Sequence, residues 1–228
     1  MTDEAFRVAA VVPARDEELT VARTVEALRG LAVDEVVVVD DGSSDGTSGA
    51  ALAAGATVLR IPGHAGKGGA VEGAVGRLPP ADVWLFADAD LGSSAEGLGS
   101  LLDIVRSGRA DMAIAIFPPG SGGGIGSVKR ASAAAIRLLT RYRAEAPLSG
   151  QRALTGSCLA AIRPLAGGFG METAMTIDAV RAGFRVVEIP VPGLTHRATG
   201  RTLRGFLHRG RQGLQIARAS MVRAVRLR

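Results

Sequence analysis

The sequence predicts an α/β fold built on a doubly wound β-sheet. Short apolar runs alternate with segments of helical periodicity from residue 6 to residue 117, which is typical of such sheets. Residues 34–40 include four consecutive valines, which suits a central parallel strand covered on both faces. Ligands of these sheets bind beyond the carboxyl ends of the strands, so the residues at those ends are the first candidates for function.

In the first half of the chain, the sequence pattern predicts each strand and helix in turn. An apolar run ending in proline predicts a strand at residues 6–13, and apolar residues near helical spacing predict a helix at 17–28. The remaining expected strands and helices of this half alternate at residues 34–40, 45–54, 56–62, 66–78, 83–87, 96–106 and 111–117.

The second half is less regular. A segment rich in Pro, Gly and Ser predicts a loop at residues 118–126. The elements expected beyond it are a helix at 127–142, a polar turn at 148–152, a helix near 172–182, a strand at 184–190 and a basic helix from about 201. No repeat and no clear domain boundary interrupts the chain.

Composition excludes several classes of protein. With 228 residues, of which 47% are hydrophobic, the chain is long and apolar enough for one folded domain. A single cysteine, Cys158, allows neither an internal disulfide nor a zinc site of paired cysteines, and suits a reducing compartment. The acidic start does not resemble a signal peptide, and no run reaches the roughly 20 apolar residues of a membrane span. We therefore expect a cytoplasmic protein.

Charge is unevenly distributed along the chain. The net charge is +5, yet from Arg197 onward there are nine arginines and no acidic residue. An amphipathic stripe at residues 202–228 predicts either a helix packed on the body or a helix on an anionic membrane surface, which would make the protein peripheral on the inner face of the membrane. Nucleic acid is not expected as the partner, because only 4% of residues are aromatic and stacking side chains are scarce.

Carboxylates gather at the ends of three expected strands. They are Asp16, Glu17, Asp40, Asp41, Asp88 and Asp90. The carboxylates of such a cluster repel one another unless a bound cation offsets their charge. Asp88 and Asp90 are two residues apart, so in extended backbone they share one face and suit Mg²⁺ or Mn²⁺ gripping a diphosphate. The alternative is that these aspartates only form polar turns.

The run Val38-Val39-Asp40-Asp41-Gly42-Ser43, taken with Asp88-Ala89-Asp90-Leu91, resembles the family 2 glycosyltransferases. This resemblance implies the GT-A fold, a mixed and mainly parallel sheet flanked by helices. It also implies that the donor is a nucleoside-diphosphate sugar carrying UDP, GDP or dTDP. The residues implied to bind its nucleotide part are Pro13, Ala14, Arg15, Glu17, Asp41, Asp88 and Ala89, with Asp90 as the main metal ligand and a catalytic residue.

Gly66-Lys67-Gly68-Gly69 opens an expected helix. Glycines let backbone approach a phosphate, and a helix N-terminus favours anions. Relatives use a lysine here near the nucleotide, so Lys67 is a donor-binding candidate; the alternative is a tight turn with an exposed lysine.

Two further motifs resemble two different relatives. Ser149-Gly150-Gln151-Arg152 resembles the polyprenyl- and dolichyl-phosphate sugar transferases, and makes Gly150, Gln151 and Arg152 acceptor candidates. Gly168-Phe169-Gly170-Met171-Glu172, with Thr195-His196-Arg197, resembles the glucosyl- and mannosyl-phosphoglycerate synthases. In the synthases a histidine at this position joins the metal, so His196 is the third ligand candidate beside Asp88 and Asp90.

One departure from the family pattern bears on the acceptor. Many inverting relatives carry a Glu-Asp pair whose aspartate is the general base, but here Glu172 is followed by Thr173. A sugar hydroxyl needs a base, whereas a phosphate monoester with a second pKa of about 6 is already ionised at neutral pH. We therefore expect a phosphate-bearing acceptor, with Arg152 holding the phosphate and Glu172 acting as base or ordering the acceptor loop.

The expected function is metal-dependent transfer of a hexose to polyprenyl phosphate, or alternatively to a small phosphorylated acid such as 3-phosphoglycerate. Two alternatives come from other functional classes: a sugar-phosphate nucleotidyltransferase and a non-catalytic nucleotide-sugar-binding module. The expected domains are a transferase domain at 1–200, with a nucleotide-sugar half at 1–117 and an acceptor half at 118–200, and a basic amphipathic helix at 201–228. The sequence does not determine the oligomeric state; a homodimer is one expectation.

Overall fold

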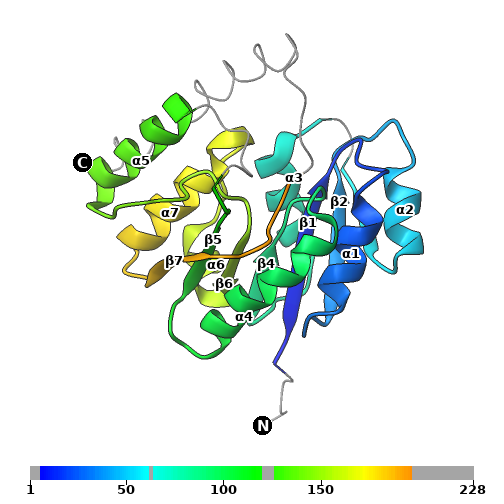
Figure 1. Ribbon diagram of the computed structural model, residues 1–228, viewed down its shortest axis with the longest axis horizontal. Helices are drawn as coiled ribbons and strands as arrows, with labels where there is room; N and C mark the ends of the chain where they lie inside the picture. The colour runs from blue at the N-terminus through cyan, green and yellow to red at the C-terminus, as the bar shows by residue number, and fades with distance from the viewer. Residues whose placement is uncertain (1–5, 62–63, 120–125, 197–228) are drawn as a thin grey trace.

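A mixed sheet forms the centre of the protein. The computed structural model describes residues 6–61, 64–119 and 126–196, without the side chain of Phe169. Within these residues the sheet has seven strands in the order β3-β2-β1-β4-β6-β5-β7 (Figure 1). The strands are β1 (Val8–Ala14), β2 (Glu35–Asp40), β3 (Thr57–Arg60), β4 (Val83–Phe86), β5 (Met112–Ile116), β6 (Arg152–Thr155) and β7 (Val186–Pro190). Only β6 runs antiparallel to its neighbours, so the predicted mixed, mainly parallel sheet is confirmed.

Helices cover both faces of this sheet. One face carries α1 (Val21–Arg29), α2 (Thr47–Ala53), the 3-10 helix η1 (Gly92–Leu98) and α4 (Gly99–Arg106). The other face carries α3 (Gly66–Val75), α6 (Gly156–Ile162) and α7 (Met171–Arg181), and the short 3-10 helix η2 (Gly168–Gly170) precedes α7. The helix α5 (Gly126–Thr140) packs against α7 at the edge of the molecule (Figure 1).

The central strands are buried on both sides, as the valine run predicts. Along β1, Val8, Ala10 and Val12 pack toward the α1 side, whereas Ala9 and Val11 pack toward the α3 side. The alternation follows from the strand period of two. Two separate apolar layers therefore hold the strand ends in place from above and below the sheet.

The second half of the chain differs from the sequence prediction at residues 148–162, where the structure forms β6 and the helix α6. Residues 148–152 were expected to form only a turn, but Arg152 begins β6, which fits between β4 and β5. Thr155 then caps α6, because its hydroxyl accepts a hydrogen bond of 3.1 Å from the backbone of Cys158. A four-residue strand is too short to show a period in sequence, and its partners are distant along the chain.

The two expected halves share one sheet. The strands β6 and β7 belong to the expected acceptor half, yet they pair with β4 and β5 of the nucleotide-sugar half. The expected basic helix at 201–228 lies outside the described residues. None of the described helices is both long and apolar enough to cross a membrane.

Candidate active site and metal centre

Three neighbouring parallel strands direct their carboxyl ends to one edge of the sheet. The strand β1 lies between β2 and β4 and is parallel to both. The segment after β4 carries Asp88-Ala89-Asp90, and the segment after β2 carries Asp41. Burial of the strands therefore places polar side chains from distant segments at the same edge, as expected for this class of sheet.

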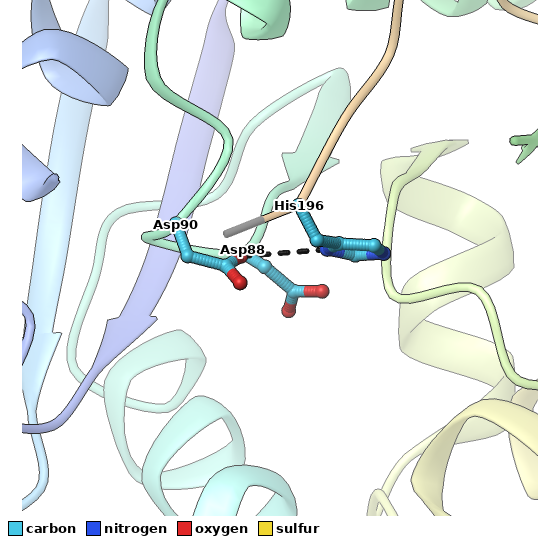
Figure 2. Close-up of side chains that lie close together, drawn as sticks. All are labelled: Asp88, Asp90 and His196. Atoms are coloured by element: carbon cyan, nitrogen blue, oxygen red, sulfur yellow. Dashed lines mark hydrogen bonds and ion pairs between the residues drawn. The ribbon is translucent and has the colours of Figure 1, made fainter. Parts of the chain in front are cut away.

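Asp88, Asp90 and His196 form a candidate metal centre. Each offers one ligand atom, and these atoms lie within 4.8 Å of one another. Figure 2 shows the two aspartates on the segment after β4 and His196 on a separate segment that approaches them. Two carboxylate oxygens suit Mg²⁺ or Mn²⁺, and an imidazole nitrogen suits Mn²⁺ better than Mg²⁺. The residues present thus fit the expected ion.

An aromatic contact holds the imidazole of His196. Its ring stacks on Phe117 with the centroids 4.0 Å apart and an angle of 16° between the planes. Nδ1 of His196 lies 3.5 Å from Oδ1 of Asp90. Because Phe117 directly follows β5, the edge of the sheet also fixes the third ligand candidate.

Lys67 joins the metal centre to α7. Its ammonium Nζ lies 2.6 Å from Oδ1 of Asp88 and 2.8 Å from Oε1 of Glu172. The side-chain amide of Gln151 donates a hydrogen bond of 2.7 Å to Oδ2 of Asp88. Both oxygens of Asp88 therefore have a close donor, and Lys67 and Gln151 lie beside the metal centre.

These contacts shift two pKa values in opposite directions. Burial by itself would raise the pKa of Asp88, but the Lys67 ammonium outweighs it and the pKa is lowered. Burial would likewise lower the pKa of Lys67, but the carboxylates of Asp88 and Glu172 raise it well above its ordinary value. The ion pair therefore stays charged through the neutral range.

Asp41 organises the entrance to α3. Its two carboxylate oxygens accept hydrogen bonds of 2.8 Å and 2.9 Å from the backbone of Ala65 and Gly66. His64 also approaches this carboxylate, with its Nδ1 2.7 Å from Oδ2 of Asp41. This carboxylate thus positions the turn that carries Lys67; its expected contact with the donor stays a prediction.

The end of β1 supplies the other expected nucleoside contacts. Ala14 is buried and Arg15 is exposed. Glu17 joins this loop to α2, because its backbone donates a hydrogen bond of 2.8 Å to the hydroxyl of Thr47. Pro13 precedes Ala14 at the same strand end, so the four residues form one short stretch beside the metal centre's strand.

Arg152 corrects an expectation. The sequence suggested that its guanidinium holds an acceptor phosphate, but the residue is 1% exposed. Its Nε donates to the carbonyl of Ser149 at 2.8 Å, and another nitrogen donates to the hydroxyl of Thr176 at 2.9 Å. Burial is the main reason that its pKa falls to about 10, although the carboxylates of Glu172 and Glu188 oppose the change. Because Arg152 starts a central strand, its side chain enters the core and supports the loop before it.

Glu172 is also turned away from bulk solvent. It is 5% exposed and its carboxylate is paired with Lys67. Thr173, which stands where many relatives have the aspartate base, is fully buried. In the structure Glu172 is therefore the ion-pair partner of Lys67, and its action as a base stays a prediction.

A pocket of about 360 Å³ opens beside the metal centre. Its lining joins the end of β5, the start of α5 and the segment before β6, and reaches Asp88 and His196. The lining residues are Asp88, Ile116, Phe117, Pro118, Pro119, Lys129, Ala146, Pro147, Leu148, Ser149, Gly150, Gln151 and His196. Gly150 and Gln151, both expected acceptor residues, lie in this wall, whereas Arg152 does not.

Phe117 and Lys129 are two of the lining residues that sequence reasoning missed. Phe117 was assigned only to a strand, and Lys129 only to a helix. Lys129 is one of just two lysines in the chain, and the other is Lys67. That scarcity is a signal that could have drawn attention to it; for Phe117 the sequence carries none.

The comparisons with known proteins agree with this geometry. The model of the glycosyl transferase family 2 matches residues 9–163. The chain belongs to this family. Its GT-A fold is shared with a crystal structure of glucosyl-3-phosphoglycerate synthase from Mycobacterium tuberculosis, which superposes with a TM-score of 0.79 at 26% identity, covering 96% of this chain and 80% of that one. That protein was solved with Mn²⁺, uridine diphosphate and glucosyl-3-phosphoglycerate.

Curated relatives of this family 2 member carry two kinds of name. Glucosyl-3-phosphoglycerate synthase of Mycolicibacterium paratuberculosis is 30% identical, over 75% of this chain and 59% of the relative. Glycosyltransferase AglJ of Haloferax volcanii is 29% identical, over 79% of this chain and 60% of the relative. The chain thus spans about three-fifths of the length of these curated relatives.

Proposed function

We propose that this family 2 member transfers a hexose from a nucleoside-diphosphate sugar to a phosphate-bearing acceptor, with Mg²⁺ or Mn²⁺. The observation that carries the proposal is the cluster of Asp88, Asp90 and His196 within 4.8 Å, at the carboxyl end of β4. The family match favours this transferase over a nucleotidyltransferase or a non-catalytic binding module.

The donor side is built from the strand ends. Asp88, Asp90 and His196 would hold the ion, whose chemistry is to neutralise the charge of the departing diphosphate. Lys67 supplies a fixed ammonium at the same place, and Pro13, Ala14, Arg15, Glu17, Asp41 and Ala89 are the proposed nucleotide contacts. Uridine diphosphate in the similar Mycobacterium tuberculosis structures supports UDP as the nucleotide.

The acceptor is proposed to enter the 360 Å³ pocket. Ser149, Gly150, Gln151 and Asp88 line this pocket, and Lys129 of α5 adds a positive charge to the lining. Glu172 is engaged by Lys67, so the nucleophile is best supplied already ionised. A phosphate oxygen meets that need, which supports a phosphate-bearing acceptor.

Two acceptors are each favoured by one observation. The names of the curated relatives and the complexes of the neighbouring structures favour a small phosphorylated acid such as 3-phosphoglycerate. The pocket walls favour polyprenyl phosphate, because they include Ile116, Phe117, Pro118, Pro119, Ala146, Pro147 and Leu148. A small acid with several negative charges would gain little from such walls.

The polyprenyl branch has a consequence for location. A lipid acceptor would place the protein at an anionic membrane surface, which the basic segment 201–228 suits by its charge. Cytoplasmic location and a homodimer are part of the same proposal. Co-sedimentation with anionic vesicles would check binding to the membrane surface, and light scattering would check the homodimer.

The decisive assay follows release of nucleoside diphosphate. UDP-, GDP- and dTDP-sugars are offered with Mn²⁺, Mg²⁺ or chelator, and with polyprenyl phosphate in detergent or with 3-phosphoglycerate. Asp90→Ala should abolish metal-dependent release, whereas Asp103→Ala, an exposed carboxylate on α4, should not. The acceptor that accelerates the release of nucleoside diphosphate decides between polyprenyl phosphate and the small phosphorylated acid. Absence of release and of binding for every donor would refute the proposal.

A further inference from the structure

The ammonium group of Lys67 lies at the metal centre. Nζ of Lys67 lies 2.6 Å from Oδ1 of Asp88, and Gln151 lies 2.7 Å from Oδ2. The ammonium therefore offsets part of the negative charge that a divalent cation would meet at Asp88. The other carboxylate, Asp90, has Nδ1 of His196 at 3.5 Å from its Oδ1.

We propose that Lys67 makes metal binding depend on the nucleoside diphosphate: the ammonium weakens the site for a bare divalent cation and strengthens it for a cation that arrives with the diphosphate. This proposal rests on the proposed function, since it concerns the same metal centre. It adds a coupling between the two ligands, in which the ion and the nucleotide bind more tightly together than either binds alone.

The weakening follows from distance. A Mg²⁺ ion bound by a carboxylate lies about 2.0–2.1 Å from its oxygen. A cation on Asp88 and the ammonium of Lys67 would therefore share one small carboxylate group and repel each other. The repulsion is poorly screened, because the side chains of Lys67 and Asp88 are only 23% and 25% exposed.

Lys67 is not free to move away from an incoming ion. Glu172 holds the ammonium from the α7 side at 2.8 Å, and that carboxylate is only 6% exposed. Removing Lys67 from this position would leave Glu172 buried without its ammonium. Gly150 closes another side, because a Cβ there would contact the Lys67 ammonium and would lie 2.9 Å from Oδ1 of Asp88. The positive charge is thus a fixed part of the site.

A diphosphate reverses the sign of the effect. Its anionic oxygens can contact the metal ion and the ammonium together, so the charge that repelled the bare ion now attracts the complex. The metal and the nucleotide then raise each other's affinity by the same factor, as thermodynamic linkage requires. Lys67 is the residue that separates the two states.

The test measures Mn²⁺ binding itself. Free Mn²⁺ is followed by electron paramagnetic resonance in titrations with and without UDP, on the full chain. For the wild type we expect UDP to tighten Mn²⁺ binding by about 5–150-fold. For Lys67→Met we expect bare Mn²⁺ to bind about tenfold tighter or more, and the gain on adding UDP to shrink.

Two further variants make the result specific. Lys67→Arg keeps the charge and should retain weak binding of bare Mn²⁺ and a large gain with UDP. Arg77→Met removes an exposed positive charge just beyond α3 and should change neither quantity. If Lys67→Met does not fold, as shown by its circular dichroism, Lys67→Gln, which removes the charge but keeps a hydrogen-bond donor for Glu172, takes its place with the same expected result.

The outcomes separate the two proposals. Wild-type protein that binds no UDP with Mn²⁺ would overturn the proposed function itself. Wild-type protein that binds UDP and Mn²⁺, but binds bare Mn²⁺ equally tightly, would overturn only the role of Lys67. Unchanged or weaker binding of bare Mn²⁺ by folded Lys67→Met would do the same.

Discussion

The imidazole of His196 lies flat against the ring of Phe117, with centroids 4.0 Å apart and planes 16° from parallel. The contact joins a candidate metal ligand to the residue that directly follows β5. It limits the orientations of the imidazole before any ion binds, and such preorganisation lowers the entropic cost of binding.

Phe117→Ala should therefore weaken Mn²⁺ binding measured in the presence of UDP. An aromatic contact of this kind contributes about 0.5–1.5 kcal/mol, which corresponds to a loss of roughly 2- to 10-fold in affinity. Phe117→Tyr should retain most of the affinity, since it keeps the ring. Phe6→Ala, which removes an exposed ring beside Arg106, is the control. Equal Mn²⁺ affinities for Phe117→Ala and the wild type would show that stacking does not orient the ligand.

Arg152→Met should destabilise the protein. Its guanidinium is buried and donates hydrogen bonds to Ser149 and Thr176. Loss of these bonds from the core should lower the free energy of unfolding by about 2–5 kcal/mol. Urea denaturation measures the loss; Arg109→Met, on an exposed turn, is the control. If Arg152→Met unfolds like the wild type but needs a much higher acceptor concentration for transfer, Arg152 would bind the acceptor phosphate after all.

Gly150→Ala should disturb the ion pair between Lys67 and Asp88. A Cβ at this position would lie 2.9 Å from Oδ1 of Asp88 and would also touch the ammonium. We expect UDP-dependent Mn²⁺ binding to weaken at least several-fold, measured by titration calorimetry. Gly49→Ala, on α2 where a Cβ meets nothing within 4 Å, should be neutral or stabilise by about 0.5–1 kcal/mol. Unaltered Mn²⁺ binding by Gly150→Ala would mean that the ion pair can shift freely.

Asp40 should make stability depend on acid pH. Burial would raise the pKa of this carboxyl, but hydrogen bonds from Ser48 and Ser43 and the charge of Arg60 lower it below the ordinary value of about 3.9. A lowered folded-state pKa stabilises the fold above the unfolded pKa, and this contribution is lost as the pH falls through the folded pKa.

The matching experiment compares urea denaturation from pH 7 to pH 2.5. Asp40→Asn should be less stable than the wild type at pH 7, and the difference should shrink below about pH 4. Asp103→Asn, on the exposed side of α4, should show no such convergence. A constant difference between Asp40→Asn and the wild type at all pH values would contradict the assignment.

The sequence by itself determined the sheet and the place of its site. Four consecutive valines in β2 and the apolar run of β1 can be stable only as strands buried on both faces. The aspartates at the ends of such strands then gather at the carboxyl edge of the sheet. The ligand candidates Asp88 and Asp90 follow from that local pattern alone, and the histidine followed from the family resemblance.

Tertiary structure decided the rest, because distant packing sets which side chains are buried. His196 approaches Asp90 across 106 residues of chain, and only the fold could show that Phe117 supports it. The sequence suggested that Arg152 is a surface residue that binds the acceptor. In the structure it begins β6, a strand too short to be predicted from sequence, and its side chain is buried in the core. The charge balance among Asp88, Lys67 and Glu172 likewise exists only once α3 and α7 are packed on the same face of the sheet.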